Sequence, residues 1–307
     1  MKIVSLFSGA GGLDLGLIKA GHEIIWANDF DADSCETYRL NIGKHIVCQD
    51  ISNIKLDEIP DCEVVVGGFP CQGFSLANML RAADDDRNKL YQQFYRIING
   101  KKPNYFIAEN VRGILSLDNG NAIKNIVKDF SEAGYRVKYK PFNTADFGVP
   151  QTRVRVIIVG TRNDIPEEMD FQFPQPTHSK SNWVSISSAL KGIPEPDDST
   201  SVLKNHIYSK YKVTNRNFTG HRETNPDKPS PTILARGNGK GGVCAIQHPM
   251  NHRRMSVRES ALVQTFPIDF EFIGSMGSMY RQVGNAVPVL FGQLLGQKLK
   301  QLETVLI

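Results

Sequence analysis

The chain has 307 residues, of which 40% are hydrophobic, 22% charged and 9% aromatic. This length predicts about two domains with a substantial core, and the composition excludes disordered, collagen-like and coiled-coil proteins. No apolar run approaches the ~20 residues that a membrane helix needs, so no membrane contact is predicted. The N-terminal apolar run reaches glycine by residue 9, which is not typical of a signal peptide.

The charge of the chain is unevenly distributed. The formal net charge is +4, yet residues 201–258 contain eleven Lys or Arg and two Asp or Glu, a local net charge of +9. This segment either faces a polyanion or forms a solvated basic surface. The five cysteines, at positions 35, 48, 62, 71 and 244, include no C-x-x-C pair. Neither a metal site nor a disulfide framework is therefore predicted, and a reducing cytoplasm fits best.

Short apolar runs alternate with amphipathic ones over the first 160 residues. Strands are expected at 2–7, 23–28, 45–48, 62–66, 105–108, 137–142 and 154–160, and helices at 12–20, 31–40, 89–98 and 122–133. This alternation predicts an α/β fold with a mostly parallel sheet, whose ligands bind at the carboxyl ends of the strands. After about residue 165 prolines become frequent, which indicates a linker into a smaller, irregular second domain. Helices are expected again at 257–265 and 288–302.

A glycine-rich turn, Phe7-Ser8-Gly9-Ala10-Gly11-Gly12-Leu13, follows the first strand and opens a helix. Glycines there let the backbone approach a ligand. Asp29 ends the second strand and Asp50 the third, where carboxylates can accept from ribose hydroxyls and from an adenine amino group. An adenosine-containing cofactor is predicted. The turn does not follow G-x-G-x-x-G, because Asp14 occupies the place of the third glycine. Taken alone, the turn is equally compatible with a purely structural role.

Three further motifs carry chemistry. Pro70-Cys71-Gln72 follows the fourth strand, which places a thiol on a loop suited to nucleophilic catalysis. Glu109-Asn110-Val111 ends the next strand and brings a carboxyl group to the same sheet edge, where it can transfer a proton. Gln151-Thr152-Arg153-Val154-Arg155 places two arginines on one face of a strand, where they can orient the substrate, the glutamate or a phosphate. The other cysteines lack such a context and are interpreted as structural.

In this order, the motifs make the chain resemble the bacterial cytosine-5 DNA methyltransferases of restriction–modification type. The resemblance extends over nearly the whole chain, except for residues ~165–255, and includes Asp86-Arg87-Asn88-Lys89-Leu90, Arg258-Glu259, Gln264-Thr265-Phe266-Pro267 and Gln282-x-Gly284-Asn285-Ala286-Val287-Pro288. It implies a Rossmann-like S-adenosylmethionine-dependent methyltransferase domain, at 1–180 plus 278–307. A smaller, irregular target-recognition domain, at 181–277, is inserted in it.

The resemblance also implies the reaction. Cys71 would add as a thiolate to carbon 6 of a cytosine flipped out of duplex DNA, and Glu109, held by Asn110, would protonate or hydrogen-bond ring nitrogen 3. Carbon 5 would then take the methyl group from S-adenosylmethionine, leaving S-adenosylhomocysteine. Arg155 would hold the cytosine carbonyl and Arg153 would support the loop. The cofactor-binding residues implied are Phe7, Gly9, Gly11, Gly12, Leu13, Asp29, Phe30, Asp50, Ile51, Pro70, Asn285, Ala286 and Val287.

Double-stranded DNA is the partner that the resemblance implies. Residues 72–88 would form a loop that closes over it. The expected DNA contacts are Gln72, Ser75, Arg87, Arg216, Arg222, Thr232 and Arg236, the last four from the basic region. The protein is expected to act as a monomer in the bacterial cytoplasm, at the nucleoid. A separately encoded restriction endonuclease would be its counterpart, without a stable complex.

Three alternatives stay open at this point. A tRNA cytosine-5 methyltransferase of the same fold would use the same chemistry, and its discriminating feature is the substrate that accepts the methyl group. A catalytically silent nucleic-acid-binding homologue would lack part of the Cys71, Glu109 and arginine set, which is complete here. A nicotinamide oxidoreductase is disfavoured by Asp14 in the glycine turn.

Overall fold

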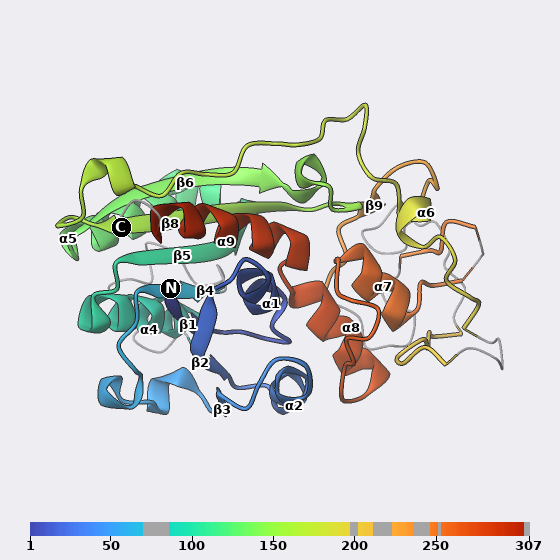
Figure 1. Ribbon diagram of the computed structural model, residues 1–307, viewed down its shortest axis with the longest axis horizontal. Helices are drawn as coiled ribbons and strands as arrows, with labels where there is room; N and C mark the ends of the chain where they lie inside the picture. Colours follow the sequence, from blue (N-terminus) through green and yellow to red (C-terminus); the bar gives the residue numbers. More distant parts are fainter. Residues whose placement is uncertain (70–85, 197–201, 211–222, 236–245, 251–252, 304–307) are drawn as a thin grey trace.

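The computed structural model describes residues 1–69, 86–196, 202–210, 223–235, 246–250 and 253–303. Its central feature is a seven-stranded sheet in the order β3-β2-β1-β4-β5-β8-β6 (Figure 1). The strands are β1 (Lys2–Leu6), β2 (Glu23–Asp29), β3 (Ile46–Cys48), β4 (Val64–Gly67), β5 (Tyr105–Val111), β6 (Tyr135–Asn143) and β8 (Val154–Arg162). The pairs from β3 to β5 are parallel, whereas β8 runs antiparallel to both β5 and β6. The predicted α/β class and mostly parallel sheet are confirmed.

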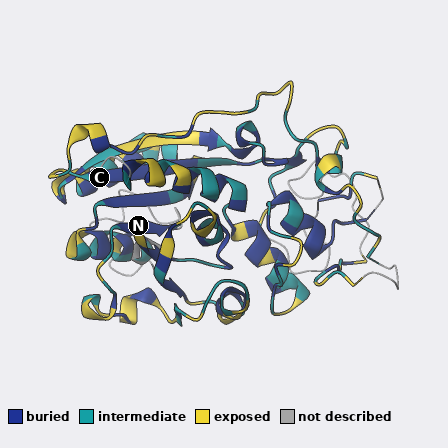
Figure 2. Cartoon of the chain, viewed as in Figure 1, coloured by how far each residue is buried: buried dark blue, intermediate teal, exposed yellow. Residues whose placement is uncertain are grey.

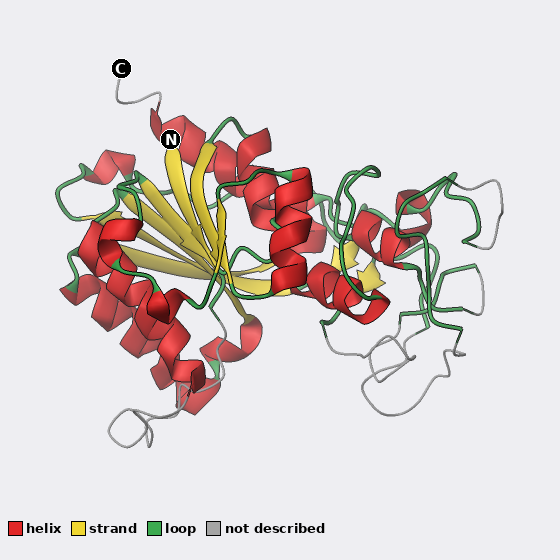
Figure 3. Cartoon of the chain, turned by 90° about the horizontal axis from the view of Figure 1, so that it is seen from below, coloured by secondary structure: helices red, strands yellow, loops and turns green. Residues whose placement is uncertain are grey.

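Helices cover both faces of this sheet (Figure 3). One face packs against α4 (Asp86–Lys101) and α5 (Asn121–Glu132), and the other against α1 (Gly12–Lys19), α2 (Ala32–Asn41) and α9 (Val289–Glu303). Alternate residues of each strand serve the two layers, as in β5, where Phe106 faces the first layer and Ile107 the second. The dark strands of Figure 2 show the resulting two-sided burial. In the described parts of the chain, no helix is long and apolar enough to cross a membrane.

A third core lies beside the sheet body. It is built from α6 (Ile186–Ala189), α7 (Val257–Val263), α8 (Met276–Asn285) and short segments near residues 233, 246 and 255. A two-stranded sheet joins this part to the first, because β7 (Gln151–Thr152) pairs with β9 (Ser230–Pro231). The chain then returns to the sheet body through α9, which packs along α1 (Figure 1).

Helix α8 was not among the elements expected from the sequence. Its apolar residues Met276, Met279, Tyr280 and Val283 are spaced i, i+3, i+4, i+7 and pack in the third core, so the helix is amphipathic. Gly284 packs directly on the backbone of residues 234–235, where a Cβ would come within 2.5 Å. Gly277 and Gly284 disfavour a helix by propensity, and the tertiary packing at Gly284 overrides that preference.

Candidate active site and cofactor pocket

The glycine turn between β1 and α1 has the backbone that its composition predicts. Gly11 adopts a φ of +86°, a left-handed conformation that glycine accommodates without strain. A Cβ on Gly12 would lie 2.4 Å from the Val287 carbonyl oxygen and 3.1 Å from the Ala286 side chain. A Cβ on Gly9 would meet nothing within 4 Å. The turn is thus closed against residues 286–287 on one side and open at Gly9.

Asp29 joins this turn to the end of β2. Its Oδ2 accepts a hydrogen bond from the Gly9 amide at 2.8 Å, and its Oδ1 accepts one from the Asp31 amide at 2.9 Å. Burial raises the pKa of Asp29, and these two backbone donors oppose that shift. The next side chain, Phe30, is 73% exposed at the end of a buried strand. An exposed aromatic ring beside a buried carboxylate suits a ligand with one flat and one hydroxylated part.

Asp50 and Ile51 differ from each other in exposure. Asp50 is exposed and caps a short helical turn, with its Oδ1 accepting from the Ser52 amide at 2.8 Å. The Ile51 side chain is buried in the sheet core, and its carbonyl accepts from Arg96 at 3.1 Å. Among the other predicted cofactor residues, Phe7 and Leu13 are partly buried and Asn285 is exposed at the end of α8.

The carboxyl ends of β4 and β5 bring the predicted acid next to the predicted nucleophile loop. Gly67 pairs with Ala108, so Gly68 lies beside Glu109, and a Cβ on Gly68 would lie 3.3 Å from Glu109 Oε2. Asn110 is 2% exposed, and its Nδ2 donates to the Phe69 carbonyl at 2.8 Å. Asn110 therefore fixes the last described residue before Pro70 and Cys71. The close approach at Gly68 is a feature that the motif reading did not identify.

The two predicted arginines have different partners. Arg155 Nε forms an ion pair with Glu109 Oε1 at 2.7 Å, with only 12% and 13% of the two side chains exposed. The pair lacks the alignment of a hydrogen bond. Arg153 lies between β7 and β8 and donates to the carbonyls of Ile233 and Gly284, both at 3.1 Å. Because Arg153 is not within a strand, the two arginines do not share one face of a strand as the sequence predicted. Arg155 contacts Glu109, which favours the orientation of the glutamate among the roles considered for the arginines.

Burial lowers the pKa of the Arg153 guanidinium to about 9, and the nearby Arg155 charge adds to the effect. Its two carbonyl partners belong to the segment after β9 and to α8, so Arg153 ties the sheet body to the third core. Gln151 acts in the same way. It donates to the Gln264 side chain at 2.8 Å and accepts from the Ile233 amide at 2.9 Å. Gln151 and Gln264 both belong to sequence motifs, but their role in joining the sheet body to the third core was not predicted.

Several predicted site residues lie outside the described residues. These are Pro70, Cys71, Gln72, Ser75, Arg216, Arg222 and Arg236. The predicted closing loop at 72–88 is also outside them up to residue 85, and residues 86–88 belong to α4. Arg87 is in that helix, without a described side chain. Thr232 is described, and its hydroxyl donates to the Thr152 carbonyl at 2.7 Å.

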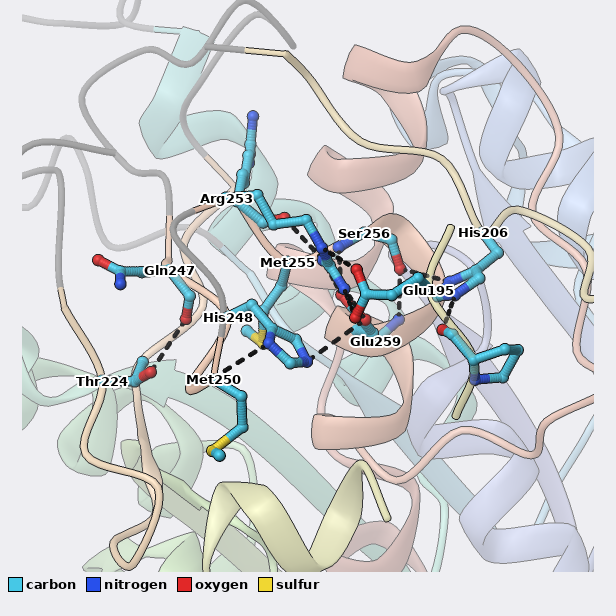
Figure 4. Close-up of polar contacts among 12 residues, drawn as sticks. Glu195, His206, Thr224, Gln247, His248, Met250, Arg253, Met255, Ser256 and Glu259 are labelled. Carbon is cyan, nitrogen blue, oxygen red and sulfur yellow. Dashed lines mark hydrogen bonds and ion pairs between the residues drawn. The ribbon is translucent and has the colours of Figure 1, made fainter. Parts of the chain in front are cut away.

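A buried ion cluster organises the third core (Figure 4). Arg253 forms two hydrogen bonds with Glu259, at 2.7 and 2.8 Å, and two with Glu195, at 2.9 and 3.3 Å. His206 contacts the Ser256 hydroxyl at 2.8 Å and the Pro194 carbonyl at 2.7 Å. Although burial opposes it, the Arg253 hydrogen bonds hold the pKa of Glu259 below its usual value. The cluster fixes three separate chain segments to the start of α7.

The comparisons with known proteins agree with this geometry. Residues 1–301 match the family model described as C-5 cytosine-specific DNA methylase. The chain is 41% identical to the Type II methyltransferase M.NgoFVII of Neisseria gonorrhoeae, with 94% of this chain and 83% of that protein covered. It is 36% identical to the Type II methyltransferase M.FnuDI of Fusobacterium nucleatum, with 99% and 95% covered. The S. pombe Dnmt2 methyltransferase structure superposes with a TM-score of 0.74 at 21% identity, with 100% and 99% of the chains covered. The chain belongs to the C-5 cytosine-specific DNA methylase family.

Proposed function

We propose that the protein transfers a methyl group from S-adenosylmethionine to carbon 5 of a cytosine within a specific site in duplex DNA. The observation that carries the proposal is the arrangement at the ends of β4 and β5. There Glu109 is paired with Arg155 at 2.7 Å, and Asn110 holds the Phe69 carbonyl at 2.8 Å, two residues before Cys71. A carboxyl group and a cation thus share one edge of the sheet with Gly68 and Phe69, the residues that precede Pro70 and Cys71 in the sequence.

The residues at the carboxyl ends of β1 to β3 fit S-adenosylmethionine. The open side of Gly9 leaves room for the methionine part, and Asp29 can accept from ribose hydroxyls. The exposed Phe30 ring offers a stacking face for adenine, and Asp50 offers an exposed acceptor at its edge. Residues 286–287 close the turn from the C-terminal segment. When bound, S-adenosylmethionine supplies an electrophilic methyl group, and its product is S-adenosylhomocysteine.

Carbon 5 of cytosine is a weak nucleophile, so the residues of this chain must raise its electron density. Addition of the Cys71 thiolate to carbon 6 pushes electrons toward carbon 5 and ring nitrogen 3. Glu109 stabilises the charge at nitrogen 3 by a hydrogen bond or a proton, which avoids a bare carbanion. Arg155 keeps Glu109 in place and can reach the cytosine carbonyl. After methyl transfer, the carbon 5 proton is released to solvent water, and the electrons of the broken C–H bond re-form the C5–C6 double bond and expel Cys71 as a thiolate.

Two domains divide the work in this proposal. Residues 1–180 plus 278–307 form the catalytic domain, and residues 181–277 form the target-recognition domain. The third core supports this division, although it also contains Ala10 of the glycine turn and extends along α8 to Val289, past the proposed boundary. The +9 charge of residues 201–258 would attract DNA phosphates, with Arg216, Arg222 and Arg236 as base-reading candidates and Thr232 as a further proposed DNA contact. Gln72, Ser75 and Arg87 would contact DNA from the catalytic side.

We further propose that the protein acts as a monomer in the bacterial cytoplasm, at the nucleoid. Methylation would protect DNA from a separately encoded restriction endonuclease, without a stable complex between the two enzymes. The Type II methyltransferase relatives support this setting.

The replacement Cys71→Ser tests the proposal. Methyl transfer should be lost, since a hydroxyl is a far weaker nucleophile than a thiolate, whereas S-adenosylmethionine binding by calorimetry should be unchanged. The matched control is Cys48→Ser, an exposed cysteine at the end of β3, which should retain activity. Appreciable methyl transfer by Cys71→Ser would contradict the assigned role.

A further inference from the structure

Asp14 is a fully buried acid that the proposed chemistry does not use. It lies in the first turn of α1 with 1% of its surface exposed. The Ser5 hydroxyl donates to its Oδ1 at 2.7 Å, and the Tyr38 hydroxyl donates to its Oδ2 at 2.8 Å. Neither donor is a cation. Burying a carboxylate between two neutral hydroxyls costs free energy, so a residue that only filled this space would be better apolar.

The Ser5 branch of this contact leads to the start of the glycine turn. Because Ser5 gives its hydroxyl hydrogen to Asp14, its oxygen is left to accept from the Ser8 hydroxyl, 3.0 Å away. The Ser8 carbonyl in turn accepts from the Gly11 amide at 2.9 Å. Asp14 thereby sets the orientation of a hydroxyl chain that ends in the backbone of the turn.

The Tyr38 branch leads to the other side of the same turn. A Cβ on Gly11 would lie 2.9 Å from a Tyr38 ring carbon, so the Tyr38 ring packs directly against Gly11. Tyr38 is itself fully buried, and its hydroxyl also lies 3.1 Å from His45 Nε2. The hydrogen bond from the Tyr38 hydroxyl to Asp14 fixes the position and orientation of the ring that packs against Gly11. Asp14 therefore contacts both supports of the turn, from β1 and from α2.

We propose that Asp14 is a positioning residue of the cofactor pocket, which holds Ser8 through Ser5 and Gly11 through Tyr38 in the conformation that receives S-adenosylmethionine. This inference rests on the proposed function. It explains why an acid takes the place of a third glycine. A glycine at position 14 would offer no acceptor to Ser5 and Tyr38, whereas the Asp14 carboxylate accepts from both.

Calorimetric binding of S-adenosylmethionine and S-adenosylhomocysteine tests the inference, together with steady-state kinetics. Asp14→Asn keeps the shape of the side chain but replaces one acceptor oxygen by a donor. The dissociation constant and the KM for S-adenosylmethionine should rise about tenfold, while kcat at saturating S-adenosylmethionine changes less than about twofold. Tyr38→Phe should show the same split, and the double variant should be no weaker than the worse single variant.

The matched control is Asp170→Asn. Asp170 is 8% exposed and pairs with Arg136 at 2.6 Å and Lys138 at 2.9 Å, on the flank of β6. This variant should lose thermal stability without weaker binding. Unchanged binding by Asp14→Asn, or an equal loss in Asp170→Asn, would overturn the inference. If Asp14→Asn does not fold, Tyr38→Phe alone decides. Wild-type protein that binds no S-adenosylmethionine would instead contradict the proposed function.

Discussion

The Asn110 side chain donates a hydrogen bond to the Phe69 carbonyl at 2.8 Å and so joins the end of β5 to the loop that leads to Cys71. Its Oδ1 simultaneously accepts from the Val111 amide at 2.9 Å. The Asn110 side-chain amide thus donates through its nitrogen and accepts through its oxygen, directly after Glu109 in β5. One residue fixes the relative positions of the acid and of the nucleophile loop.

Replacing Asn110 should therefore impair catalysis without affecting the cofactor. Asn110→Asp keeps the acceptor for Val111 but loses the donor to Phe69, so kcat should fall about 100-fold, a loss typical of a misplaced catalytic group. The S-adenosylmethionine dissociation constant should be unchanged. Rapid-quench methyl transfer and calorimetry measure the two quantities. A variant with wild-type kcat would show that the contact does not position the loop.

Glu109 and Arg155 should behave as one unit. Glu109→Gln removes the proton donor and should lower kcat by about 10²–10⁴-fold. Arg155→Gln should cause a similar loss, because the carboxyl group then lacks its 2.7 Å partner. The double variant should be little worse than either single one, since residues of one catalytic unit are not additive. Losses that multiply in the double variant would contradict this coupling.

The buried acid Asp14 predicts a pH dependence of stability. Burial raises its pKa from 3.8 to about 6, and the Ser5 and Tyr38 hydrogen bonds only partly oppose this. Between these two pH values the folded chain holds a proton that the unfolded chain has released, so stability falls as the pH rises. The contribution is about 3 kcal/mol, lost between pH 4 and 6. Urea unfolding across this range should show the decline in the wild type and not in Asp14→Asn. Parallel profiles would contradict it.

The ion cluster of Figure 4 predicts a stability effect that is separate from the cofactor pocket. Glu259 is 1% exposed and bonded twice to Arg253. Glu259→Gln should reduce the free energy of unfolding by about 3–5 kcal/mol, because it leaves a buried cation short of a partner. S-adenosylmethionine affinity of the folded protein should not change. The exposed pair Lys128 and Glu132, 3.8 Å apart on α5, is the matched control, and Glu132→Gln should cost less than about 1 kcal/mol.

The basic segment predicts a salt dependence. Replacing Arg216, Arg222 or Arg236 by Glu should weaken DNA binding and reduce the slope of log affinity against log salt by about one unit per lost phosphate contact. Lys128→Glu, on the exposed side of α5, should leave the slope unchanged. A slope that stays constant in all variants would place the DNA site elsewhere on the molecule.

Sequence patterns could predict the sheet body because its central strands β1, β4 and β5 are short apolar runs and helices such as α5 are amphipathic. The expected helix at 122–133 and strand at 105–108 correspond to α5 (Asn121–Glu132) and β5 (Tyr105–Val111). The antiparallel direction of β8 was not predicted. Strand direction depends on how the chain crosses the sheet, and an apolar run alone carries no sign of it. Helix α8 was missed although its apolar residues have helical spacing, because Gly277 and Gly284 disfavour a helix and only tertiary packing overrides that propensity.

The candidate site was predictable to the extent that its residues occur in short motifs. Glu109 and Asn110 were found because they end a strand, and the structure places them beside the start of the Cys71 loop. The separate partners of Arg153 and Arg155 could not be read from sequence spacing, because a break between β7 and β8 redirects Arg153. The bracing role of Asp14 depends on contacts with Tyr38, 24 residues away, which no local pattern records.

The most direct measurement is methyl transfer from labelled S-adenosylmethionine to unmethylated bacterial DNA, with tRNA in parallel, followed by bisulfite sequencing of the DNA. The account predicts label on the DNA and a recurring protected cytosine in one short sequence. Label on tRNA alone, or no label from folded protein that binds S-adenosylmethionine, would contradict it.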